Sequence, residues 1–167
     1  MKRSRRDIIK ISAAGLTVGS LLSIELNEGT SVKEFMGRAT ARYVLNPREY
    51  LEPKATEDIG IRPFSLDFTH EFDEMNGLYD TVSDVSETVE KQRGDCVDHS
   101  AVAASWLLQH TNRRPYVVAY APLGVDYGHI NVYDGGAIYD YTGVYKGKDP
   151  ETYARMKDMK VLYKSQV

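Results

Sequence analysis

The sequence predicts an α+β fold in which one helix packs on a small antiparallel sheet. The helix is indicated over Val97–His110, where apolar residues recur at the spacing of one helix face. Two segments rich in β-formers, Tyr116–Tyr120 and His129–Tyr133, follow a proline-containing break. Asp134-Gly135-Gly136 then marks a hairpin turn, and Ala137–Tyr141 is the returning strand. A helix followed at once by adjacent antiparallel strands is expected to cover one face of their sheet.

Two more helices are expected before this unit. Ser31 opens the first in a capping-box pattern, and the helix is predicted over Val32–Val44. The second is predicted over Asp84–Gln92, with Ser83 as its N-cap and Gly94 as the residue that ends it. These helices belong to the same domain as the sheet, since no repeat or second domain is visible in the sequence.

The remaining segments carry shorter patterns. Phe64, Leu66 and Phe68 alternate with polar residues and predict a short strand. The C-terminal tail predicts a helix over Glu151–Met156 and a final strand over Lys160–Tyr163. With these elements, the expected globular domain spans residues 31–167.

Composition narrows the class of protein. The chain has 167 residues, of which 42% are hydrophobic, enough for one domain with a real core. Its net charge is −3 although its first ten residues are strongly basic, so the body is acidic and nucleic acid is not an expected partner. One cysteine and scattered histidines give no zinc-ligand spacing, and no metal or cofactor is expected.

The N-terminal segment 1–24 has the layout of an export signal. Met1–Lys10 is basic, and Ile11–Ile24 is uncharged, apolar and rich in small residues. Ser4–Lys10 resembles a twin-arginine signal, which implies the twin-arginine export machinery as a partner. The expected location is therefore outside the cytoplasmic membrane. Either the segment is cleaved, with Ser20 as the best candidate site, or it stays as a membrane anchor facing outside.

Cys96, the sole cysteine, is the candidate nucleophile. It lies where the central helix should begin, and a helix N-terminus stabilises a thiolate. His129, at the start of the strand predicted over His129–Tyr133, is the candidate base. Asp140 on the returning strand can orient the His129 ring. His99 is a second-ranked partner for the thiol. The alternatives are an inert buried cysteine, a structural strand histidine and a turn aspartate.

The backbone N–H of Cys96 could supply part of an oxyanion hole. The sequence does not identify the second donor, for which Gln92, Asn76 and Tyr79 are candidates.

Five further segments form an ordered pattern along the chain: Gly94–Asp98, Val102–Leu108, Arg114–Tyr120, Gly128–Tyr133 and Tyr139–Thr142. In this order they resemble the transglutaminase-like superfamily, which has a papain-like fold. The resemblance covers about Val82–Gly143 and implies Cys96 as nucleophile, His129 as general base and acid, and Asp140 as the orienting residue. After the histidine stands Ile130-Asn131, where the family often has Ala-Trp, so the resemblance does not identify a substrate.

These observations together predict an exported thiol-dependent acyl-transfer enzyme. The first expectation is a cysteine peptidase or amidase that hydrolyses amide bonds in a protein or peptide substrate through a thioester on Cys96. The alternatives are a protein-crosslinking transglutaminase and a catalytically inactive binding module on the same fold.

Overall fold

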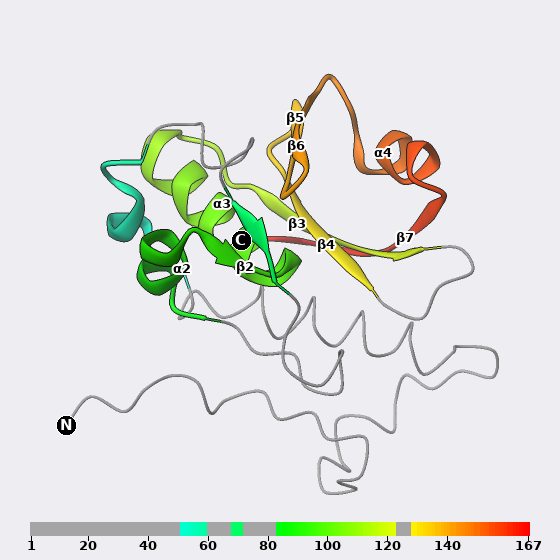
Figure 1. Ribbon diagram of the computed structural model, residues 1–167. Helices are drawn as coiled ribbons and strands as arrows, with labels where there is room; N and C mark the ends of the chain where they lie inside the picture. The colour runs from blue at the N-terminus through cyan, green and yellow to red at the C-terminus, as the bar shows by residue number, and fades with distance from the viewer. Residues whose placement is uncertain (1–50, 60–67, 72–82, 123–127) are drawn as a thin grey trace, which may run out of the picture.

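A computed structural model describes residues 51–59, 68–71, 83–122 and 128–167 (Figure 1). Helices and antiparallel strands both contribute to this part of the chain, so the α+β class is confirmed. The expected N-terminal signal in 1–24 and the helix expected over Val32–Val44 lie outside the described residues. Most of the strand expected around Leu66 lies outside them as well.

A five-stranded antiparallel sheet forms the centre of the fold, in the order β6-β5-β4-β3-β7. The three strands expected after the central helix are present, with β3 two residues longer and β5 one residue shorter than predicted. Strand β6 was not predicted, and β7 extends well beyond the expected Lys160–Tyr163. The bounds are β3 Tyr116–Pro122, β4 His129–Tyr133, β5 Ala137–Asp140, β6 Gly143–Lys146 and β7 Met159–Gln166.

The described residues contain three α-helices. Helix α3 (Cys96–His110) is the predicted central helix, extended by one residue at its start. Helix α2 (Val85–Lys91) precedes it, and α4 (Pro150–Met156) lies between β6 and β7, with the Asp149 carboxylate accepting from the Thr152 N–H at its start. A short 3-10 helix, η2 (Pro53–Thr56), also belongs to this region.

The ends of α2 differ from the prediction. Its N-cap is Asp84 rather than Ser83, and its C-cap is Gln92, which adopts the left-handed conformation with φ 51°. Gly94 therefore does not end the helix. It lies in β2 (Arg93–Gly94), which pairs in parallel with β1 (Thr69–His70). This pairing is non-local, so the local pattern around Gly94 could not predict it.

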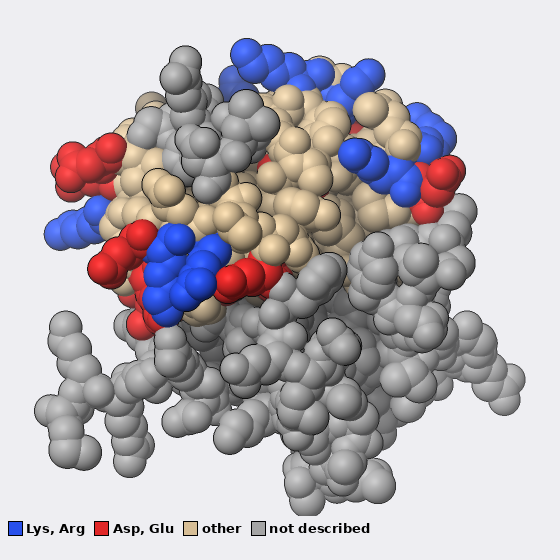
Figure 2. Space-filling model, viewed as in Figure 1, with Lys and Arg blue, Asp and Glu red and all other residues tan. Residues whose placement is uncertain are grey.

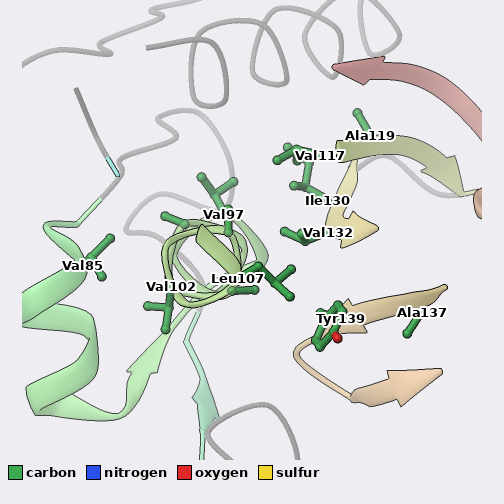
Figure 3. Close-up of a cluster of buried hydrophobic side chains, with 13 residues drawn as sticks. Val85, Val97, Val102, Leu107, Val117, Ala119, Ile130, Val132, Ala137 and Tyr139 are labelled. Atoms are coloured by element: carbon green, nitrogen blue, oxygen red, sulfur yellow. The ribbon is translucent and has the colours of Figure 1, made fainter. Parts of the chain in front are cut away.

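The main hydrophobic core lies between α3 and one face of the sheet (Figure 3). Period-two alternation along the strands selects this face, because side chains of every second residue point the same way. Burying these side chains stabilises the fold by roughly 1.5–3 kcal/mol for each large one. The sheet contributes Val117, Ala119, Ile130, Val132, Ala137 and Tyr139, and the helix contributes Val97, Ala101, Val102, Ala103, Ala104 and Leu107.

A second, smaller core lies on the other face of the sheet, under α4. Val118 and Tyr120 of β3 and Ile138 of β5 meet Tyr153 and Ala154 of the helix there. Both faces of the sheet are therefore covered by helix in the described part of the chain. His129 and Asp140 alternate with the main core residues of β4 and β5, so they belong to the face that α4 covers.

The surface of the described region is charged and largely free of exposed apolar side chains. On the face seen in Figure 2, Lys, Arg, Asp and Glu gather along the margins of the described region, and uncharged residues occupy the area between them. Met156 is the one large hydrophobic side chain that is exposed among the described residues. Within the same residues, no helix has the length and apolar character needed to cross a membrane.

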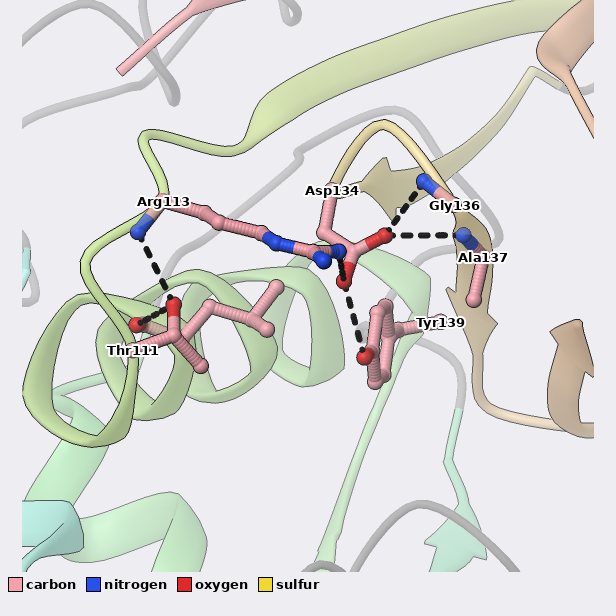
Figure 4. A network of polar contacts seen from close by, with 7 residues as sticks. Thr111, Arg113, Asp134, Gly136, Ala137 and Tyr139 are labelled. Atoms are coloured by element: carbon pink, nitrogen blue, oxygen red, sulfur yellow. Dashed lines mark hydrogen bonds and ion pairs between the residues drawn. The ribbon is translucent and has the colours of Figure 1, made fainter.

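The β4–β5 hairpin is held by one carboxylate in its turn (Figure 4). Asp134 Oδ1 accepts hydrogen bonds from the backbone N–H groups of Gly136 (2.8 Å) and Ala137 (2.7 Å). Its Oδ2 accepts from Arg113 (3.1 Å) and from the Tyr139 hydroxyl (3.2 Å). Burial, followed by the nearby Asp134 charge, raises the pKa of Tyr139 to about 12, so this hydroxyl stays a donor. The carboxylate therefore defines where the hairpin turns.

We expect Asp134→Ala to lower the free energy of unfolding by about 1–3 kcal/mol, because two turn N–H groups and a buried hydroxyl lose their acceptor. Asp134→Asn keeps one oxygen acceptor and should lose less. Urea unfolding of the two variants and the wild type measures this difference. Equal stability of Asp134→Ala and the wild type would contradict the assigned role.

Candidate active site at the start of α3 and the end of the β4–β5 hairpin

Cys96 is the first residue of α3, and its position is set by a capping box. Asp95, the N-cap, is extended, and its Oδ1 accepts from the N–H groups of Val97 (2.8 Å) and Asp98 (3.1 Å). Asp98 Oδ2 accepts in return from the Asp95 N–H at 3.3 Å. The thiol is partly buried at this helix start. Both flanking carboxylates thus organise the backbone that carries Cys96.

Gly94 is required by the same arrangement. A Cβ at this position would lie 2.6 Å from Asp98 Oδ2 and 2.7 Å from Asp98 Cβ. Asp98 is itself buried, and its Oδ1 accepts from the Ser83 N–H at 2.7 Å. The Gly-Asp-Cys-Val-Asp motif therefore has a structural explanation at three positions: close approach at Gly94 and capping at Asp95 and Asp98.

We expect Gly94→Ala to destabilise the protein by about 2 kcal/mol, the scale of losing a helix cap, since the new methyl group must displace the Asp98 carboxylate. Gly136→Ala is the matched control, because its Cβ would meet nothing nearer than 3.5 Å. Denaturant unfolding compares them. The explanation fails if the two variants lose the same stability.

The structure brings His129 and Asp140 together, as their positions on the hairpin predicted. His129 Nε2 donates to Asp140 Oδ2, and Oδ1 accepts from the Thr142 N–H (2.9 Å) and hydroxyl (2.6 Å). Asp140 is 1% exposed. Burial alone would raise the pKa of this carboxyl, but the bonds from His129 and Thr142 outweigh it and hold the pKa well below its usual range. The carboxylate is thus ionised while buried.

Aromatic side chains fix the His129 ring on the α4 face of the sheet. Its centroid lies 6.1 Å from that of Tyr120 and 6.5 Å from that of Tyr153. The Tyr120 hydroxyl donates to Asn131 Oδ1 at 2.9 Å. Burial, followed by the charge of Asp140 and a hydrogen bond to it, raises the pKa of Tyr153 far above its usual range. Neutral rings therefore surround the imidazole–carboxylate pair.

Rings of Tyr141 and His70 connect this pair to the strand before Cys96. The Tyr141 ring meets that of His129 edge-on, with centroids 5.7 Å apart. The same ring lies 4.4 Å from that of His70. His70 pairs with Gly94, two residues before the cysteine. His70 of β1 therefore contacts the end of the β4–β5 hairpin through Tyr141 and pairs with β2, the strand that precedes α3.

His70 is not among the residues that the sequence predicts for the site. It is half-buried, and its pKa is lowered, first by burial and next by the charge of His129, while Asp140 opposes this shift. No local pattern marks His70, because its place depends on a parallel pairing across more than twenty residues.

His99, the second-ranked partner for the thiol, is a core residue. It is 1% exposed, and the Phe68 ring meets it edge-on at 5.0 Å. Burial lowers its pKa to about 4, against a smaller opposing effect of Asp140. Of the three candidate oxyanion donors, Gln92 is the exposed C-cap of α2, while Asn76 and Tyr79 lie outside the described residues.

The His99 environment predicts an acid-sensitive fold. Its folded pKa lies below the ordinary value of 6.5, so the unfolded chain binds the extra proton between pH 6.5 and 4. The free energy of unfolding therefore keeps its full value above pH 6.5. It falls by up to about 3 kcal/mol as the pH drops from 6.5 to 4. Denaturant unfolding across this range should show a shallower slope in His99→Gln. Equal slopes in His99→Gln and the wild type would contradict this account.

In comparisons with known proteins, no family model, no curated protein and no solved structure matches this chain. The described residues also contain no group of three or more His, Cys, Asp or Glu side chains that could hold a metal ion.

Proposed function

We propose that this chain is an exported cysteine peptidase or amidase with a papain-like, transglutaminase-like core. In this proposal Cys96 is the nucleophile, His129 the general base and acid, and Asp140 the residue that orients the imidazole. Export would rest on the twin-arginine-type segment within residues 1–24, and the catalytic domain would span residues 31–167.

The contact between Asp140 and His129 is the observation that carries the proposal. An ionised carboxylate can only accept a hydrogen bond, so His129 Nε2 carries the proton that it donates to Asp140. In the neutral imidazole, Nδ1 is then the acceptor, which is the state a general base requires. A buried carboxylate bonded to a partly exposed histidine is also the second half of a nucleophile triad.

The position of Cys96 at the start of a helix supports its proposed role as the nucleophile. Cys96 is the first residue of α3, where the unpaired N–H groups and the helix dipole stabilise negative charge. The flanking carboxylates of Asp95 and Asp98 are occupied by backbone N–H groups of the capping box, which reduces their opposition to a thiolate. These features favour a lowered thiol pKa.

The proposed reaction proceeds in two halves. His129 takes the proton of the Cys96 thiol, and the sulfur attacks an amide carbonyl carbon to form a C–S bond. The C–N bond then breaks, and His129 returns its proton to the leaving amine. Water, deprotonated by the same imidazole, attacks the thioester; a C–O bond forms, the C–S bond breaks, and the thiol and a carboxylic acid are released.

Alkylation of Cys96 by iodoacetamide at neutral pH tests the nucleophile. We expect rapid labelling of the native protein and at least about tenfold slower labelling of His129→Ala, because in the proposed mechanism this imidazole takes the thiol proton and stabilises the thiolate. Asp140→Asn should slow labelling as well, and His110→Gln is the control that should not. A thiol that reacts only after denaturation would defeat the proposal.

A peptide mixture with added monodansylcadaverine separates the possible fates of the acyl group. New amino termini support hydrolysis, whereas incorporation of the fluorescent amine would instead identify a crosslinking transglutaminase. If neither appears and the thiol is inert, the chain is a binding module on the same fold. Cys96→Ala should abolish either activity.

A further inference from the structure

We infer that His70 is a further catalytic residue of the proposed active site, where its ring N–H donates to the carbonyl oxygen of the acyl group that Cys96 attacks. This inference rests on the proposed function and supplies the second oxyanion donor that the sequence left unidentified. In this role a neutral histidine, which is not one of Cys96, His129 and Asp140, stabilises the negative charge that develops on the carbonyl oxygen.

Strand pairing places His70 beside the start of α3. The Thr69 N–H donates to the Gln92 carbonyl and the Glu71 N–H to the Gly94 carbonyl, both at 2.9 Å. His70 is held between these two bonds, directly opposite Gly94. Neighbouring strands lie about 4.8 Å apart, so the backbone of His70 runs alongside Gly94, two residues before Cys96.

Alternation along β1 directs the His70 ring inward. Glu71 and Arg93 form an ion pair of 3.2 Å on the exposed side of the two strands. His70 and Gly94 belong to the opposite, more buried side, as the exposure pattern of both strands confirms. The histidine therefore faces the protein interior near the helix start, while its neighbours in sequence face solvent.

Contacts with the hairpin fix the ring in place. Its centroid lies 4.4 Å from that of Tyr141, the residue after Asp140, and Tyr141 also meets His129. His70 responds to the charges of both His129 and Asp140, which places it within electrostatic reach of the pair. It thus lies between β2 and the end of the β4–β5 hairpin.

The chemistry of the ring suits an oxyanion donor better than a second base. Burial and the neighbouring His129 favour the neutral form of His70. A neutral imidazole always carries one N–H donor, and a fixed donor aimed at a developing alkoxide lowers the barrier without moving a proton. Cys96 would supply the other donor from its backbone N–H at the helix start.

Two probes of Cys96 distinguish this role from a structural one. Acylation by p-nitrophenyl acetate passes through a tetrahedral oxyanion: the C–S bond forms, then the C–O bond breaks and p-nitrophenolate leaves. Alkylation by iodoacetamide displaces iodide at carbon and forms no oxyanion. His70→Phe keeps a ring against Tyr141 without a donor, and His70→Gln keeps an N–H donor.

We expect His70→Phe to slow acylation by about a hundredfold, the usual effect of removing one oxyanion donor, while alkylation stays within about twofold of the wild type. His70→Gln should recover most of the acylation rate. If His70→Phe does not fold, as judged by its thermal unfolding, His70→Leu and His70→Asn form the second pair without and with a donor.

Equal acylation rates of His70→Phe and the wild type would overturn this inference, as would parallel losses in both reactions. Failure of the proposed function gives a different result: wild-type protein would then release p-nitrophenolate no faster than Cys96→Ala.

Discussion

The buried carboxylate of Asp140 is the constraint on which the site depends. An ionised group that is 1% exposed is costly unless donors surround it, and here His129, Thr142 and Tyr153 all donate to it. These donors come from β4, from the residues after β5 and from α4, so satisfying one carboxylate fixes three elements relative to one another. The same bonds set the tautomer of His129, which links the folding of the sheet to the chemistry proposed for it.

At the start of α3, the same residues serve structure and candidate function. Asp95 and Asp98 close a capping box around Cys96, and Gly94 gives the Asp98 carboxylate the room that it needs. An acidic sequence around a cysteine therefore does not by itself argue for or against a reactive thiol. These acidic residues instead determine where the helix begins, because the capping box places Cys96 at the first position of α3, where negative charge is stabilised.

His70 and His99 show how two histidines near one site are assigned to different roles by their surroundings. His99 lies on the buried side of α3 against Phe68 and remains neutral in the core. His70 lies on a two-residue strand whose other residue faces solvent, and its ring reaches the hairpin end through Tyr141. Separation from Cys96 in the sequence does not predict which histidine is accessible, since His99, the nearer of the two in the sequence, is the more buried.

Local patterns in the sequence determined the α+β class, helix α3, strands β3 to β5 and the adjacency of His129 and Asp140. They did so because helix periodicity, strand alternation and an Asp-Gly-Gly turn act over a few residues, and a hairpin turn sets which side chains become neighbours. Tertiary structure alone decided the parallel pairing of β1 with β2, the left-handed end of α2 at Gln92 and the position of His70. Each of these depends on contacts between segments distant in the chain, and their free energy comes from burial and hydrogen bonding that no short window of sequence contains.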